Sequence, residues 1–165
     1  MSNDQTIQNL QTALEMEMTA AHQYQLHAQV LDDWGLNLLA AKMREEMQEE
    51  IGHSDLFMER IIYLGGTPEL RFQKQPKRAE TLQEMFEMDA ADEQEAIEVY
   101  TKGAQQAGEV GDIGSRVLFE KIVLDEEGHK GWLDLQLSLL ARLGERAFSA
   151  KWIALGDTGA APAEA

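Results

Sequence analysis

Two copies of a Glu-x-x-His motif are the clearest candidates for chemistry in this sequence. Glu50-Ile51-Gly52-His53 and Glu126-Glu127-Gly128-His129 each place a carboxylate and an imidazole three positions apart. On a helix this spacing puts both side chains on one face, where they can hold one metal ion from the same side. One such motif alone would be weak evidence for a metal site.

Two further glutamates repeat at matching intervals. The interval along the chain from Glu17 to Glu50 equals the interval from Glu93 to Glu126, so the whole set repeats at an offset of 76. The Glu-x-x-His motifs can each hold one ion, the lone glutamates can come from facing helices, and two carboxylates can bridge between the ions. Four carboxylates would then balance two divalent cations.

Four helices are needed to position these groups, and apolar residues recurring at steps of three and four predict them. The four seams cover residues 7–31, 36–64, 82–107 and 115–140. Asp33-Trp34-Gly35 and the glycine-rich segment 108–114 separate the members of each pair, at the midpoints of the two equal intervals. Each predicted hairpin therefore brings its two glutamates to one level.

Acidic and imidazole side chains occupy seam positions where a helix core favours apolar residues. They are Glu17, Glu46, Glu50, His53, Asp89, Glu93, Glu126 and His129. Burying unpaired carboxylates costs several kcal/mol each, so a compensating cation is expected. One Glu from each of two helices and Glu-x-x-His from each of two others is the known ligand pattern of di-iron carboxylate bundles. Oxygen and nitrogen ligands without sulfur suit iron or manganese, although binding strength alone would favour zinc.

Composition excludes several other classes. The 165 residues include no cysteine, which excludes thiolate metal sites, iron–sulfur clusters and disulfides. The net charge of −16 argues against nucleic acid or anionic membrane as partners and favours cations, although a solvated acidic surface explains the charge by itself more readily than a cation site does. Without an apolar leader or an 18-residue apolar run, the expected location is the cytoplasm.

The linking segments predict the topology. Residues 65–80 lack a helical period, and at about 3.3 Å per residue they could span about 50 Å, enough to cross a bundle. A capping box, Thr81-Leu82-Gln83-Glu84, predicts the start of the third helix. Residues 147–155 suggest one or two further helical turns. We expect one domain, residues 1–155, and a flexible tail, residues 156–165.

With these motifs and elements the sequence resembles the ferritin family, and within it the bacterioferritins, over residues 4–155. The segments that carry the resemblance are Tyr24-Gln25-Leu26-His27-Ala28, Asp33-Trp34-Gly35-Leu36 and Asp125-Glu126-Glu127-Gly128-His129. The expected fold is therefore all-α: a ferritin-like four-helix bundle with a long crossover between helices two and three and a short C-terminal fifth helix.

The resemblance also implies a function. Glu17, Glu50, His53, Glu93, Glu126 and His129 would form a ferroxidase centre with two iron ions in each subunit. Fe(II) would be oxidised by O₂ or peroxide and stored as mineral inside a homo-oligomeric shell, usually of 24 subunits built from dimers. Tyr24 would deliver an electron to the centre, unless it is only a buried tyrosine with a satisfied hydroxyl. Glu46, rather than Glu49, is favoured for passing incoming Fe(II) to the site.

Two other classes of function remain open. A di-metal oxygenase or catalase could use the same bundle, but such enzymes usually carry extra chain for docking or a cysteine-ligated electron-transfer domain. A non-enzymatic acidic bundle serving assembly or metal buffering is less favoured, because random polar defects would not repeat at an offset of 76.

The haem position departs from the bacterioferritin pattern. In that family a methionine directly after the first Glu of Glu50-x-x-His53 holds a haem between paired subunits, and here the residue is Ile51. An aliphatic side chain cannot ligate iron, and Met47 one turn earlier is a poor substitute. The chain would then be a non-haem bacterial ferritin, or a subunit, even a non-catalytic one, of a mixed shell whose second subunit type binds haem.

We therefore predict that the homo-oligomer binds no haem b. Protein purified from haem-supplied cells should show no Soret band, because no thioether is offered at position 51. Absorption spectroscopy of the native particle measures this directly, and a Soret band would contradict it.

Overall fold

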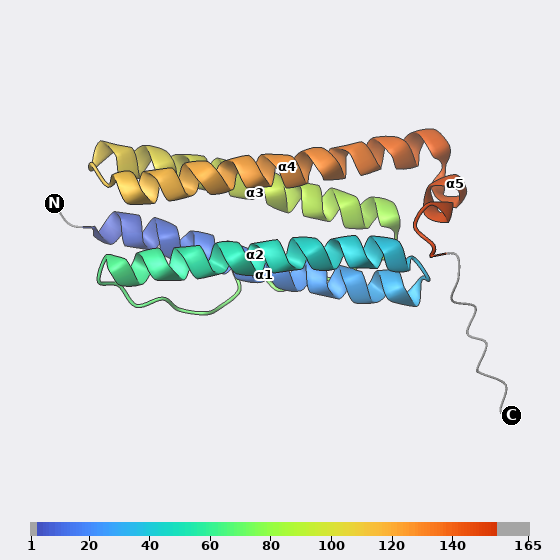
Figure 1. Ribbon diagram of the computed structural model, residues 1–165, viewed down its shortest axis with the longest axis horizontal. Helices are drawn as coiled ribbons and strands as arrows, with labels where there is room; N and C mark the ends of the chain where they lie inside the picture. Colours follow the sequence, from blue (N-terminus) through green and yellow to red (C-terminus); the bar gives the residue numbers. More distant parts are fainter. Residues whose placement is uncertain (1–2, 155–165) are drawn as a thin grey trace, which may run out of the picture.

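The structure is a computed structural model whose described residues, 3–154, form an all-helical bundle without strands (Figure 1). Its helices are α1 (Asp4–Asp33), α2 (Asn37–Tyr63), α3 (Leu82–Glu109), α4 (Ile113–Leu143) and α5 (Glu145–Ala150). The four predicted long helices are confirmed. The tail predicted at 156–165, together with Leu155, lies outside the described residues.

Two tight reversals build the two hairpins, α1 with α2 and α3 with α4. Gly35 turns the first with φ 77° and Gly111 turns the second with φ 79°. Side chains other than glycine rarely adopt this left-handed conformation, so glycine fits both turns. Both lie in the segments that the sequence predicted as turns.

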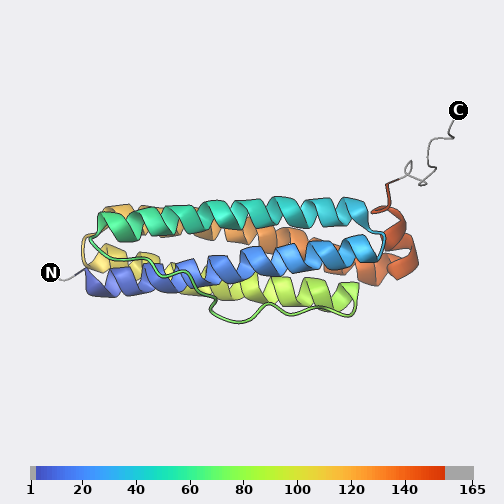
Figure 2. The ribbon, with the colours of Figure 1, turned by 90° about the horizontal axis from the view of Figure 1, so that it is seen from below.

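The connection between α2 and α3 crosses the full length of the bundle. Figure 2 shows this segment running along α1 from the end of α2 to the opposite end of the molecule, where α3 begins. Four α1 side chains or carbonyls spaced four positions apart bind its backbone: Gln11, Glu15, Thr19 and Gln23. The crossover is therefore fastened to one face of α1, and it makes α2 and α3 parallel.

Two apolar clusters fill the bundle, one on each side of a polar layer. One contains Leu31, Leu39, Met43, Phe86 and Leu133, and the other contains Leu14, Phe57, Ile61, Phe119 and Ile122. In each long helix the seam passes from one cluster to the other through buried acidic or imidazole side chains. The core is thus divided at the level where the sequence places its candidate ligands.

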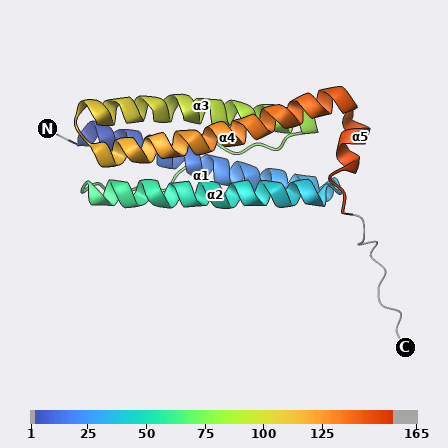
Figure 3. The same cartoon turned by 45° about the horizontal axis from the view of Figure 1, so that its top comes forward.

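The ends of two helices differ slightly from the predictions. The Thr81 hydroxyl accepts from the Glu84 N–H at 3.1 Å, as a capping box requires, but the Glu84 carboxylate accepts from the Glu80 N–H. α5 stops at Ala150 instead of continuing to 155. The chain beyond it instead caps α2, because the Trp152 carbonyl accepts from the Leu38 N–H at 3.0 Å. α5 itself lies across the end of the bundle (Figure 3).

Removing one fastening of the crossover should destabilise the protein. Gln23 is buried and its amide bonds both the N–H and the carbonyl of Lys77, at 2.8 and 2.7 Å. Gln23→Ala leaves these groups unpaired and should cost about 1–3 kcal/mol of unfolding free energy. Denaturant unfolding of the metal-free protein at fixed concentration measures it. Gln11→Ala, whose bonds to Glu69 are exposed, is the matched control and should cost clearly less.

Candidate metal centre

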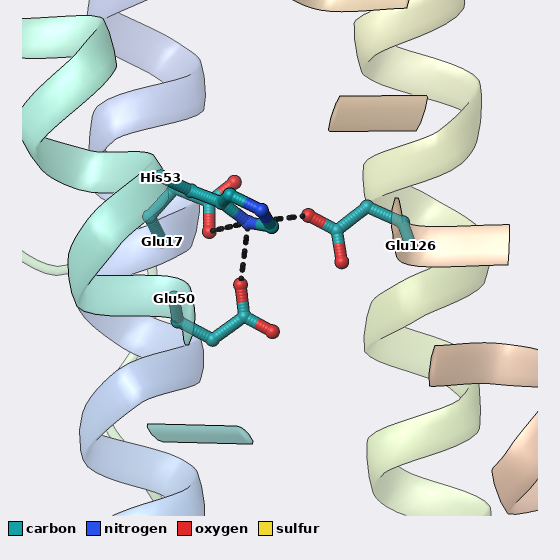
Figure 4. Close-up of side chains that lie close together, drawn as sticks. All are labelled: Glu17, Glu50, His53 and Glu126. Carbon is teal, nitrogen blue, oxygen red and sulfur yellow. Dashed lines mark hydrogen bonds and ion pairs between the residues drawn. The ribbon is translucent and has the colours of Figure 1, made fainter. Parts of the chain in front are cut away.

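Six predicted ligand side chains converge in the polar layer between the apolar clusters. They are Glu17, Glu50, His53, Glu93, Glu126 and His129, each between 1% and 8% exposed. Figure 4 shows Glu17, Glu50 and His53 from the α1–α2 hairpin and Glu126 from α4 pointing toward one another. The seams therefore bring together all six groups that the spacing predicted.

The first group of ligand atoms surrounds the imidazole of His53. His53 Nδ1 lies 3.1 Å from Glu50 Oε2, 3.2 Å from Glu126 Oε1 and 3.5 Å from Glu17 Oε2. One ligand atom from each residue lies within 4.8 Å of the others, a spacing that can accommodate a single ion. This group can hold a metal ion through three carboxylates and one nitrogen.

The second group surrounds His129 in the same way. His129 Nδ1 lies 3.0 Å from Glu126 Oε2, 3.1 Å from Glu50 Oε1 and 3.7 Å from Glu93 Oε1. Glu50 and Glu126 thus face both imidazoles, each directing one oxygen to either side. This is the geometry expected of two bridging carboxylates, with Glu17 and Glu93 each belonging to one group.

The outer nitrogens of both imidazoles face acidic residues. His53 Nε2 lies 3.4 Å from Asp125 Oδ2, and His129 Nε2 lies 3.4 Å from Glu49 Oε2. Glu49 and Asp125 are themselves related by the offset of 76, so these partners follow the same repeat as the ligands. A carboxylate at the outer nitrogen fixes the orientation of a metal-binding imidazole and raises its basicity.

Glu46 adds a carboxylate on one side only. It is 4% exposed, pairs with Lys42, and its Oε2 lies 3.2 Å from His129 Nε2. The corresponding position in the repeat is Ile122, so the other side has no equivalent. Glu46, half-exposed Glu49 and His129 line a cavity of about 300 Å³ at the surface formed by α2 and α4. This places Glu46 between that surface and the centre.

Two tyrosines bind the lone glutamates in a crossed arrangement. Tyr24 on α1 donates to Glu93 Oε1 on α3, and Tyr100 on α3 donates to Glu17 Oε1 on α1 at 2.5 Å. Burial and the neighbouring carboxylates raise the pKa of both phenols, so both stay protonated. The sequence pointed to Tyr24 but not to Tyr100, although the offset of 76 joins the two.

A buried imidazole–carboxylate pair was also missed. His27 Nδ1 lies 3.0 Å from Asp89 Oδ2, both side chains are almost fully buried, and Gln23 Nε2 lies 2.8 Å from His27 Nε2. No carboxylate stands at ligand spacing from His27 on its own seam, so the sequence assigned it no chemistry. Its partner is on α3, and helical spacing within α1 could not reveal it.

Electrostatics distinguish the bridging Glu50 from the terminal Glu17 and Glu93. Burial, followed by the charges of Glu50 and Glu126, raises the pKa of Glu17 and of Glu93 well above the ordinary value. Burial also opposes ionisation of Glu50, but hydrogen bonds from His129 and His53 outweigh it and lower its pKa to about 2. The bridging Glu50 thus ionises more readily than the terminal Glu17 and Glu93.

Both imidazoles are charged when no metal is bound. Burial would lower the pKa of each, but hydrogen bonds to carboxylates outweigh it. Glu126, Glu17 and Glu50 raise the pKa of His53, and Glu126 and Glu50 raise that of His129 to about 12. Even so, the one Nδ1–H of each imidazole is shared between oxygens of both bridging carboxylates, and Glu50 Oε1 and Glu126 Oε1 are left without a well-aligned hydrogen bond of their own. Unsatisfied buried carboxylate oxygens facing two nitrogens fit a cation pair.

The bundle and its buried layer define the class of four-helix proteins with a carboxylate-rich dinuclear site. A ferritin-like domain model matches residues 7–143 of the chain. The bacterioferritin of Rhodobacter capsulatus is 41% identical over 87% of this chain and 89% of that protein. The bacterioferritin of Brucella melitensis is 37% identical over 96% of this chain and 94% of that one.

Solved structures agree with these relatives. The Rhodobacter capsulatus bacterioferritin, described with a metal-free dinuclear site and a haem iron, superposes with a TM-score of 0.90 at 40% identity, covering 93% of this chain and 96% of that one. Mycobacterium tuberculosis BfrA superposes with a TM-score of 0.88 at 37% identity, covering 91% and 94%. The chain belongs to the ferritin family and is bacterioferritin-like.

No helix among the described residues combines the length and the apolar character that a membrane span requires.

Metal binding should release protons, because the groups that hold them when the site is empty are its ligands. Glu17, Glu93, His53 and His129 all have raised pKa values and must lose protons to bind an ion. The affinity for Zn(II), which is not oxidised, should therefore fall as the pH falls from about 8 to about 6. Calorimetry in buffers of different ionisation enthalpy counts the protons. An affinity independent of pH, with no proton release, would contradict this.

Proposed function

We propose that the chain is a one-domain iron-storage subunit, residues 1–155, whose di-iron centre oxidises Fe(II) to Fe(III) with O₂ or peroxide. The observation that carries the proposal is that Glu50 and Glu126 each direct one oxygen toward each imidazole. The proposed iron ligands are Glu17, Glu50, His53, Glu93, Glu126 and His129. The family relationship supports the assignment, because the relatives of known name are bacterioferritins.

Fe(II) is the substrate of the proposed reaction. Two Fe(II) ions carry four positive charges, which the four carboxylates balance once both imidazoles are neutral. Oxidation raises the charge of each ion, and buried carboxylate oxygens stabilise the higher charge more strongly. The ligand shell therefore favours transfer of one electron from each ion to the oxidant. Outer carboxylates at His53 and His129 keep both imidazoles oriented during this change.

Glu46 connects the centre with the surface of α2 and α4. In the proposal it transfers iron between that surface and the site, since it is buried beside His129 while Glu49 in the same cavity is half-exposed. Iron would collect as hydrated oxide inside a closed homo-oligomeric shell. We take this shell to contain 24 subunits built from dimers and to reside in the cytoplasm, as the resemblance implies.

The residues at the haem position do not fit a haem ligand. Ile51 is 39% exposed on α2 and has no donor atom in its side chain. Met47 is half-buried and packs against the apolar cluster that contains Leu39 and Met43. The haem-free homo-oligomer stays a prediction, in which a second subunit type would have to supply any haem ligand.

Loss of one terminal ligand should slow iron oxidation. Glu93→Ala removes a carboxylate from the second group, and the fast phase of aerobic Fe(II) oxidation should fall by at least about tenfold. Stopped-flow absorbance of Fe(III) formation measures it. The control is Glu98→Gln, at a position away from the ligand layer on the same helix, which should oxidise iron at the wild-type rate.

The amount of iron retained tests storage separately. Wild-type particles supplied with Fe(II) in air should keep iron far beyond two ions per subunit as a soluble, rust-coloured product. Retention of only two ions per subunit would favour a di-metal oxygenase or catalase instead. An unchanged fast phase in Glu93→Ala would show that the assigned centre is wrong.

A further inference from the structure

Tyr100 gives the metal centre a second buried phenol, beside the terminal ligand Glu17. Its hydroxyl donates to Glu17 Oε1 at 2.5 Å, and Tyr24 donates to Glu93 Oε1. Each phenol comes from the helix that carries the other lone glutamate, and the offset of 76 relates the two tyrosines as it relates the ligands. Each terminal glutamate thus has its own buried phenol.

The hydroxyl of Tyr100 is not required for packing. Its ring lies 5.5 Å from Phe57 and 6.1 Å from Phe119, in an apolar cluster where phenylalanine is otherwise used. The hydroxyl has Glu17 as its hydrogen-bond partner, which leaves the other oxygen of Glu17 facing His53. What distinguishes Tyr100 from its aromatic neighbours is therefore a phenol directed at the centre.

A small cavity lies against both phenols. It has a volume of about 20 Å³, and the residues that line it include Tyr24, Tyr100, Glu17, Glu50 and Glu93. A space of this size admits a molecule about as large as water. A water-sized molecule in this cavity would lie beside both tyrosine side chains and the ligand residues that line it.

The number of electrons that O₂ requires points to the same role for both phenols. Reduction of O₂ to two water molecules takes four electrons, and two Fe(II) ions supply only two. We propose that Tyr100 is a redox-active residue that, together with Tyr24, supplies the two remaining electrons when the centre reacts with O₂. This inference rests on the proposed ferroxidase function, and it extends to Tyr100 the role that resemblance gave to Tyr24 alone.

The step balances with reactants that the proposed function supplies. Two Fe(II), two tyrosines, one O₂ and two protons give two Fe(III), two tyrosyl radicals and two water molecules. The O–O bond breaks, and each phenol loses one electron and its hydroxyl proton. The proton of Tyr100 leaves along its hydrogen bond to Glu17. Each radical then takes one electron from a further Fe(II) and one proton, which restores the tyrosine.

The chain offers a clean test because it contains only three tyrosines. Metal-free native oligomer is mixed with two Fe(II) per subunit in aerobic buffer and freeze-quenched for electron paramagnetic resonance. Tyr100→Phe and Tyr24→Phe should each lose about half of the wild-type tyrosyl radical, and the double variant should lose all of it. Tyr63→Phe, at a position 75% exposed, is the control and should match wild type.

A second variant covers the case in which Tyr100→Phe fails to fold. In Tyr24→Phe/Tyr63→Phe, Tyr100 is the only tyrosine left, so a radical whose hyperfine pattern changes with ring-deuterated tyrosine must lie on it. Absence of that radical, or a full wild-type radical yield in folded Tyr100→Phe, would overturn the inference. A Tyr100 that only positions Glu17 would alter Fe(II) affinity without altering the radical yield per iron oxidised, which also overturns it.

Separate outcomes distinguish the redox role of Tyr100 from the proposed function. If wild-type protein fails to oxidise Fe(II) rapidly, the ferroxidase assignment itself fails. If wild-type protein oxidises and retains iron but Tyr100 never carries a radical, only the redox role of Tyr100 fails. The ratio of iron oxidised to O₂ consumed gives an independent readout, since it should fall when both phenols are removed and O₂ is reduced only to peroxide.

Discussion

Four carboxylates and two imidazoles are buried together in one layer. The rest of the structure depends on this constraint. Without metal, the layer binds protons more tightly than free groups do: carboxylate partners raise the pKa of both imidazoles, and burial raises the pKa of the terminal Glu17 and Glu93. Two divalent ions could take the place of these protons, because the ligand atoms of each group already lie within 4.8 Å of one another. The apolar clusters on either side exclude water, so the layer must be neutralised from within.

The repeat at an offset of 76 organises both the ligands and their immediate supports. Glutamates, histidines, tyrosines and outer acidic residues all occur in pairs related by it. The departures from the repeat occur farther out, where Glu46 corresponds to Ile122 and His27 corresponds to Gly103. The layer of ligands is thus nearly symmetric. Glu46 beside His129 and the buried pair of His27 with Asp89 have no counterparts in the other half of the repeat. Gly103 is needed there, since a Cβ would come within 2.8 Å of the Phe119 ring.

The sequence predicted the helices and the six candidate ligands because both are encoded as spacing along single helices. It also predicted the crossover, from a long aperiodic segment and a capping signal at Thr81. It did not reveal the pair of His27 with Asp89 or the bond from Tyr100 to Glu17, because each joins different helices and has no periodic signature. The attachment of the crossover to Gln23 was hidden for the same reason, since backbone partners leave no mark in the sequence.

The two phenols make equivalent hydrogen bonds to the centre, but their surroundings differ. Tyr100 is enclosed by Phe57 and Phe119, so Glu17 is the acceptor for its proton. Tyr24 lies near Asp89, whose charge contributes to its raised pKa, and Asp89 continues through His27 to Gln23 and the crossover backbone. The Tyr24 hydroxyl donates to Glu93 as the Tyr100 hydroxyl donates to Glu17, so a proton lost from either phenol passes first to a terminal glutamate of the layer. The symmetry of the ligands therefore does not extend to the surroundings of the two phenols, because His27, which binds Asp89 on the side of Tyr24, corresponds to Gly103 in the repeat.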